Sequence, residues 1–271
     1  MDGCRWSLEE VFKHDSWAAT ALYAAGEARA VVKFNRRAGL YFLPMAWLGR
    51  WLAARERRAY GVLGGNPGIP AACGPVSAGG RVLPHAFAHR YVDGHPLARH
   101  ERPGGEFFDR LEAIVRSIHA CDMAYLDLNK RENVLVTDRG APALVDFQIH
   151  FHPPGWLTRH GAGRRLLRLL QDSDLYHIRK LRLFHTLGPD ATAGLPVPWP
   201  SRVWRVLYVH PVQWLRRRLL VVLGIRSGRG HAISERDPEK AVRLERADLQ
   251  RSPTAEQGPP PGLERPEGKR S

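Results

Sequence analysis

The chain has 271 residues, of which 44% are hydrophobic, a fraction that is ordinary for a globular protein. Its length suits one large domain or two lobes around a real core. The formal net charge of +14 predicts attraction to polyanions, whether nucleotide, phosphosugar, anionic lipid or nucleic acid, and charge alone does not choose among them.

The cysteines and the apolar segments indicate the cellular compartment of the protein. Cys4, Cys73 and Cys121 are far apart and lack zinc-ligand spacing, which predicts reduced thiols in a cytoplasmic protein. The first ten residues carry acids and no apolar segment, so we expect no signal peptide. The most apolar late stretch, 206–225, is interrupted by three consecutive arginines, so a membrane-spanning helix is not expected.

Short strands are predicted first, over 11–34, with a turn at 24–27. The run 30–34 is typical of a buried strand and carries one lysine, Lys33. One interpretation is that the Lys33 ammonium reaches along the strand to water. The other is that Lys33 points at nucleotide phosphates, although a single lysine is a weak motif.

A helix is predicted from Pro44 to about Leu63, because apolar residues recur there at helical spacing and two glycines follow. Glu56 lies on this helix between arginines. It is either a surface acid paired with its neighbours or an inward acid that holds Lys33. An apolar strand at 86–92 then leads into an Asp-Gly-His-Pro connector.

A strongly amphipathic helix is predicted over 106–123. His119 extends its apolar face, and a lone histidine there is more typical of a core or cap position than of a catalyst. This helix leads into residues 127–148, which we call the central segment because it carries most of the candidate site residues.

The central segment is predicted to be a polar loop, a strand, a tight turn and a second strand, in that order: 127–132, 133–137, 138–140 and 143–147. Asp127, Asn133 and Asp146 lie at the ends of these strands. Such an arrangement can place a base and hold a divalent ion by oxygen ligands, as phosphoryl transfer requires. The alternative is an ordinary β-hairpin with solvated polar ends.

Three basic helices are predicted after the hairpin, over 163–171, 172–187 and 201–223. The third combines tryptophans and an arginine triplet with an apolar face. Its apolar face either packs on the core or lies on an anionic membrane. From 226 to 271 the chain is rich in Gly, Pro, Arg and Glu, which predicts a disordered tail.

The order of these features resembles the protein-kinase-like fold, and more narrowly its compact bacterial branch near RIO-type and lipopolysaccharide (Kdo/heptose) kinases. The likeness covers roughly residues 10–190. It implies an α+β, two-lobed fold: a small antiparallel-sheet N-lobe, a hinge, a mainly helical C-lobe with the catalytic loop, and the tail, over 1–91, 92–97, 98–225 and 226–271.

The resemblance also implies ATP and Mg²⁺ as cofactors. Lys33 would contact the α/β-phosphates and pair with Glu56. No G-x-G-x-x-G loop precedes Lys33, so phosphate cover would depend on Thr20 and on backbone amides.

Four further roles are implied for the central segment. Asp127 would accept or orient the proton of the attacking hydroxyl, and Lys130 would steady the γ-phosphate. Asn133 and Asp146 would hold Mg²⁺.

The segment departs from the family in three respects. Asp127 precedes Asn133 by 133 − 127 = 6 residues instead of five, which puts the base geometry in doubt. Gln148 replaces the glycine after Asp-Phe, which predicts a metal loop that does not flip. No Ala-Pro-Glu segment follows.

We therefore expect an ATP- and Mg²⁺-dependent phosphotransferase acting on a hydroxyl of a sugar, lipid or envelope glycan, or else of Ser/Thr. An anionic acceptor and peripheral contact with the inner membrane face fit the basic charge. The alternative is a catalytically weak or inactive nucleotide-binding scaffold. A nucleic-acid-binding module is suggested by charge alone, and we find no motif for specific binding.

Overall fold

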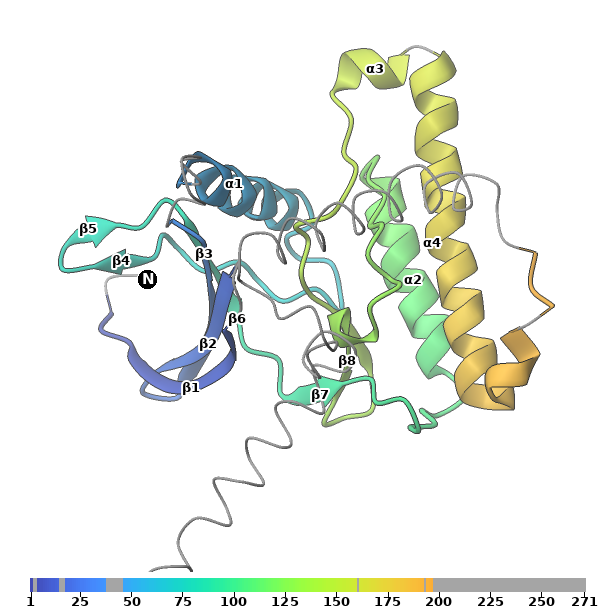
Figure 1. Ribbon diagram of the computed structural model, residues 1–271, viewed down its shortest axis with the longest axis horizontal. Helices are drawn as coiled ribbons and strands as arrows, with labels where there is room; N and C mark the ends of the chain where they lie inside the picture. Colours follow the sequence, from blue (N-terminus) through green and yellow to red (C-terminus); the bar gives the residue numbers. More distant parts are fainter. Residues whose placement is uncertain (2–3, 15–17, 38–45, 160, 193, 197–271) are drawn as a thin grey trace, which may run out of the picture. The chain divides into compact units, whose positions relative to one another are not determined.

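The computed structural model describes residues 1, 4–14, 18–37, 46–159, 161–192 and 194–196, which all lie in one compact unit spanning 1–217 (Figure 1). The predicted α+β class with a small antiparallel sheet is confirmed. The strands are β1 Ser7–His14, β2 Ala18–Ala25, β3 Ala28–Asn35, β4 Ser77–Ala78, β5 Arg81–Val82, β6 Ala86–Arg90, β7 Gly94–Pro96, β8 Val134–Thr137 and β9 Pro142–Leu144. The helices are α1 Ala46–Val62, α2 Phe107–Ala120, α3 Gly155–Arg159 and α4 Gly161–Leu187, with 3₁₀ turns η1 Arg131–Asn133 and η2 Pro189–Thr192.

The larger sheet runs in the order β1-β2-β3-β6, and every neighbouring pair is antiparallel. The predicted turn joins β2 to β3 through Gly26, whose φ of 62° costs glycine nothing sterically. Ala30 and Val32 are buried on one face of β3. Because side chains alternate along a strand, Lys33 leaves the opposite face.

Helix α1 contacts β3 and β6. Its buried side includes Ala53, Glu56, Ala59 and Tyr60, which recur at helical spacing. Glu56 is thus an acid within an otherwise apolar stripe, and it is 1% exposed. This placement favours the inward interpretation of Glu56 over the surface one.

Helix α2 forms as predicted and runs beside α4 (Figure 1). The prediction of two separate helices over 163–171 and 172–187 is wrong, because α4 is continuous across both. Asp174 lies on the buried face of α4, within the continuous helix, and bonds to another part of the chain. The predicted helix at 201–223 and the tail lie outside the described residues.

A second sheet runs in the order β7-β8-β9 and contains the predicted hairpin. Three strand limits of this hairpin were wrong. Asn133 belongs to η1, so β8 begins one residue later, and β9 begins at Pro142 instead of at 143 and ends at Leu144 instead of at 147. The reason at the end of β9 is Asp146, whose φ of 61° is incompatible with an extended strand.

Two further expectations concern single features. The three cysteines form no disulfide with one another in the part of the chain that the structure describes. Among the described helices, none combines the length and the apolar character that a membrane crossing needs.

The lowered pKa of the buried His89 predicts how the stability of the protein depends on pH. His89 stacks on Tyr60, with ring centroids 5.4 Å apart, and burial lowers the pKa of His89 to about 4. The unfolded chain takes up this proton near pH 6.5, so stability is full above that pH and falls as the pH drops toward 4. At pH 5 the loss is ~2 kcal/mol.

Urea unfolding at pH 7 and pH 5 measures this loss. We expect His89→Gln to unfold with a smaller difference between the two pH values than the unaltered protein. An equal difference in both proteins would assign the acid sensitivity to other groups.

Candidate active site

Three acids and bases meet where β3, α1 and the segment after β9 come together. Lys33 Nζ lies 2.8 Å from Asp146 Oδ1 and 3.9 Å from Glu56 Oε2. The predicted Lys33–Glu56 pair is therefore present, but the shorter contact of Lys33 is with Asp146. The Glu56 side chain is 2% exposed and that of Lys33 15%, so the group is largely shielded from water.

A second group forms around Asp127, on the loop before η1. Lys130 Nζ donates to Asp127 Oδ2 at 2.7 Å, and Asn133 Nδ2 donates to the same oxygen at 3.0 Å. Asn133 Nδ2 also lies 3.3 Å from the Asp127 carbonyl oxygen. Because the side-chain nitrogen Nδ2 of Asn133 donates to Asp127, the side-chain oxygen Oδ1 of Asn133 is the atom left to bind a cation.

Backbone hydrogen bonds hold the two groups beside each other. The Val145 N–H donates to the Asn133 carbonyl oxygen at 3.1 Å, which places Asn133 next to the residue before Asp146. Tyr125 adds a second connection, because its hydroxyl donates to the Val145 carbonyl oxygen. Six of the seven site residues expected from the sequence therefore lie close together: Lys33, Glu56, Asp127, Lys130, Asn133 and Asp146.

Thr20 is the seventh. It lies on β2 directly opposite Lys33 in the antiparallel register, so the two side chains leave the same face of the sheet. The turn between β1 and β2 includes 15–17, which lie outside the described residues. Thr20 is therefore next to Lys33, while the predicted phosphate cover by this turn stays a prediction.

Asp174 on α4 anchors the loop, and sequence reasoning missed it. Its Oδ2 accepts from the Tyr125 N–H at 2.8 Å and contacts His119 Nε2 at 3.0 Å, while its Oδ1 accepts from the Leu126 N–H at 2.8 Å. Asp174 is 0% exposed. A buried carboxylate thus fixes the backbone immediately before Asp127, and His119 has a structural role as its partner.

Strained backbone occurs at two points of the site. Leu126 has φ 67° and Asp146 has φ 61°, values in the left-handed region that non-glycine residues seldom adopt. Each costs of order 1–3 kcal/mol and persists only where the surroundings enforce it. Here Asp174 binds the Leu126 N–H and Lys33 binds the Asp146 carboxylate, so both strained residues are held from outside their own segment.

The carboxylates of the site have different acidities. Burial raises the pKa of Glu56 to about 7, although the charge of Lys33 acts in the opposite direction. Burial also raises the pKa of Asp127, against the charge and hydrogen bond of Lys130. For Asp146, burial is outweighed by the charge and hydrogen bond of Lys33, so its pKa is lowered.

Lys33 shows the reciprocal effect. Burial alone would lower the pKa of its ammonium, but the charges of Glu56, Asp146 and Asp127 together raise it. Asp146 is therefore ionised and Lys33 protonated at neutral pH. An Asp146 that is ionised at neutral pH suits a metal ligand, and a less acidic Asp127 suits a proton acceptor.

The charge balance of the site favours a cation. Asp127 and Asp146 carry two negative charges and Glu56, with its pKa of about 7, carries part of a third, against two positive charges on Lys33 and Lys130, so the site lies between neutral and −1 within a chain of net charge +14. The described residues contain no group of three or more His, Cys, Asp or Glu side chains arranged to hold a metal. Asp146 and Asn133 fit Mg²⁺, which is commonly bound by one or two protein ligands with water and phosphate oxygens completing its shell.

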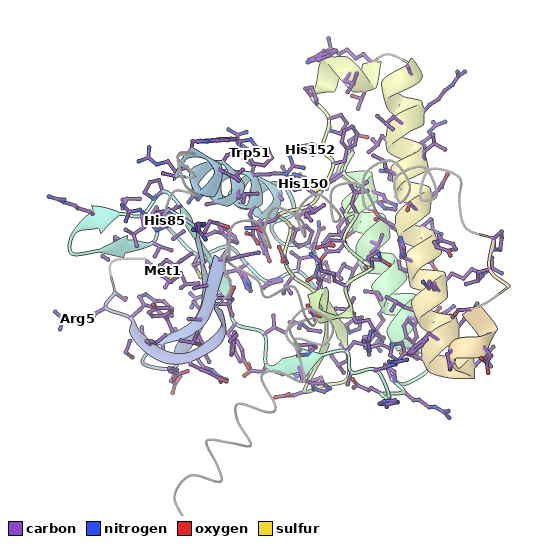
Figure 2. All side chains as sticks on the ribbon, viewed as in Figure 1. Met1, Arg5, Trp51, His85, His150 and His152 are labelled. Carbon is purple, nitrogen blue, oxygen red and sulfur yellow. The ribbon has the colours of Figure 1, made fainter. Side chains whose placement is uncertain are left out.

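The segment after Asp146 is tied to β3 and α1 by hydrogen bonds of Gln148, which the sequence analysis singled out, with Asn35 and Arg55, which it did not. Gln148 Nε2 donates to Asn35 Oδ1 at 2.8 Å. Arg55 Nε donates to the Gln148 carbonyl oxygen at 3.0 Å, and the Arg55 guanidinium also donates to the His150 carbonyl oxygen. Trp51, which is also on α1, stacks on Arg55. Figure 2 shows Trp51 on α1 and His150 on the segment after Asp146.

Comparisons with known proteins leave the family open. No protein-family model matches the chain, and no curated protein is similar to it in sequence.

Proposed function

We propose that the protein is an ATP- and Mg²⁺-dependent phosphotransferase with a two-lobed, protein-kinase-like fold, similar to RIO-type and lipopolysaccharide kinases. The observation that carries the proposal is the position of Lys33, whose ammonium lies within ion-pair distance of both Glu56 and Asp146. These residues come from a strand, a helix and a hairpin end that are far apart in sequence. An ordinary solvated hairpin gives no reason for this convergence.

The proposed roles are those that the resemblance implies, and the geometry supports them. Lys33, oriented by Glu56, binds the nucleotide phosphates, and Thr20 lies beside it. Asp146 and Asn133 are the residues that would hold Mg²⁺, which when bound neutralises charge on the phosphates. Lys130 stands next to Asp127 and steadies the transferred group.

Asp127 is the proposed base. Its raised pKa makes it a better proton acceptor than an exposed aspartate, and Lys130 and Asn133 fix the orientation of its carboxylate. An attacking hydroxyl within hydrogen-bond reach of Asp127 would lose its proton to the carboxylate as the phosphoryl group arrives.

The acceptor class is part of the proposal. The basic charge of the chain favours an anionic hydroxyl compound, such as a sugar, lipid or envelope glycan, over Ser/Thr of a protein. The same charge fits peripheral contact with the anionic inner face of a membrane.

The direct test is to incubate the purified protein with γ-labelled ATP and Mg²⁺, with and without an envelope lipid extract. We expect label to appear in the extract only when Mg²⁺ is present, and EDTA to abolish transfer. No transfer to extract, to the protein itself or to water would contradict the enzyme proposal.

A second candidate is a nucleotide-binding scaffold without chemistry. It is favoured by Asp127, which is only 6% exposed and whose Oδ2 already accepts from both Lys130 and Asn133. A scaffold would be stabilised against heat by ATP yet never turn it over. Any Mg²⁺-dependent turnover would eliminate this candidate.

A further inference from the structure

The outer side of helix α1, which faces away from the sheet, carries two exposed tryptophans. The inner side of the helix packs on β3 and β6 and buries Glu56. Trp47 and Trp51 lie one helical turn apart on the outer side and are 63% and 51% exposed. Because tryptophan is highly buried on average, two such rings open to solvent on one turn indicate a surface that binds a partner.

The charges on this outer side are all positive. Arg50 and Arg58 are exposed, and the one acid of α1 is the buried Glu56. Arg55, whose guanidinium is 5.3 Å from the centre of the Trp51 ring, also donates hydrogen bonds to the segment after β9. This stacking positions the Trp51 ring while leaving half of it exposed. We call the surface made by Trp47, Arg50, Trp51 and Arg58 the tryptophan face.

Charge and area decide between the possible occupants of the tryptophan face. A second copy of the chain would bring the same arginines, and residues 197–271 carry 15 Lys/Arg against 8 Asp/Glu, a net of +7, so both would be repelled. A helix of 17 residues is about 25 Å long and its face about 10 Å wide, which gives about 250 Å² of contact, against about 800 Å² per partner in stable protein complexes. An anionic lipid surface fits better, because arginine and tryptophan are both favoured at the boundary between headgroups and acyl chains.

We propose that the tryptophan face rests on an anionic lipid bilayer, with its two indole rings at the headgroup level and Arg50 and Arg58 against lipid phosphates. The inference rests on the membrane contact in the proposed function and assigns that contact to one face of one helix. It does not require phosphotransfer. Glu56 lies on the other side of the same helix, so the helix that binds lipid is also the one that contacts Lys33.

Cosedimentation of the full-length protein with vesicles, in the absence of nucleotide, tests the inference. The vesicles are phosphatidylcholine alone or phosphatidylcholine mixed with the anionic phosphatidylglycerol. We expect the unaltered protein to prefer the mixed vesicles, and the double variant Trp47→Ala/Trp51→Ala to bind them about tenfold more weakly, since two indole rings no longer enter the interface. Trp156→Ala is the matched control, because Trp156 lies on α3 and is also 63% exposed. Its binding should equal that of the unaltered protein.

A second variant tests the charges without removing a ring. Arg50→Gln combined with Arg58→Gln should weaken binding to the mixed vesicles about 25-fold, since each arginine at an anionic surface contributes about fivefold. Arg99→Gln combined with Arg102→Gln removes two exposed arginines from the loop before α2 and should bind almost as the unaltered protein does. Both variants keep the stacking of Trp51, so neither loses an internal contact of α1.

Equal binding of the unaltered protein and the double tryptophan variant, an equal loss in Trp156→Ala, or no preference for the mixed vesicles would overturn the inference. A lipid-free dimer that the double tryptophan variant abolishes, seen by analytical ultracentrifugation, would assign the face to a second copy and overturn it too. The outcome is separate from that of the proposed function. Vesicle binding through the tryptophan face without transfer from ATP would keep the face and discard the enzyme, and Mg²⁺-dependent transfer without vesicle binding would do the reverse.

Discussion

Replacing Asp146 by asparagine is expected to lower ATP turnover by about 1,000-fold, the effect of losing one charged group that stabilises the transition state. Asp146 is ionised, lies 2.8 Å from Lys33 and is the charged member of the proposed Mg²⁺ pair. Asparagine keeps the shape but removes the charge. The measurement is release or transfer of label from ATP, together with the Mg²⁺-dependent rise in thermal stability that ATP causes, which should also be lost.

The matched control is Asp138→Asn. Asp138 is exposed in the turn at the other end of the same hairpin, and its replacement changes the net charge by the same amount. Its turnover should equal that of the unaltered protein. If Asp146→Asn turns over ATP as fast as Asp138→Asn, the metal site is elsewhere.

Replacing Asp174 by alanine is expected to lower the free energy of unfolding by about 3–5 kcal/mol, the usual result of removing one partner from a buried charged network. Three donors lose their acceptor at once: the N–H groups of Tyr125 and Leu126, and His119 Nε2. Each stranded buried donor costs roughly 1–3 kcal/mol. Urea unfolding at neutral pH measures the total.

Asp172→Ala controls for the loss of an acid from α4, because Asp172 is exposed one residue before Ser173 on the same helix. Its stability should change by less than ~0.5 kcal/mol. The milder Asp174→Asn keeps an acceptor oxygen and should fall between the two. It should still impair turnover, because a shift of ~1 Å in the loop before Asp127 costs about 100-fold. Equal stability of the two alanine variants would show that Asp174 anchors nothing.

Local pattern predicted the hairpin because its information is local. Alternating apolar residues, a glycine turn and the order Asp127, Asn133, Asp146 all lie within one short segment. The inward position of Glu56 was one of two interpretations, and its apolar neighbours at helical spacing decided it only in the folded chain. The strand limit beyond Leu144 was missed because nothing in composition signals a left-handed φ at an aspartate.

The anchors of the site were missed because they depend on contacts distant in sequence. Asp174 was overlooked because its partners, in Tyr125, Leu126 and His119, lie 48 to 55 residues earlier in the chain. Its apolar neighbours Leu167, Ile178 and Leu181, spaced as on one helix face, were the available signal that it points inward. No pattern announces that Gln148 pairs with Asn35, because each is an ordinary polar residue until the turn after β9 meets the end of β3.

The hydrogen bonds of Gln148 restrict the movement of the neighbouring Phe147, and so the ligands that the proposed nucleotide site can accept. Phe147 is wholly buried, and its ring lies 5.0 Å from those of both Tyr60 and Tyr125. Turning this ring outward would break the bonds that Asn35 and Arg55 make to the next residue and would leave a hole between two tyrosines. Ligands whose binding requires the Phe147 ring to turn outward should therefore bind weakly. Screening should favour molecules that bind while Phe147 stays buried.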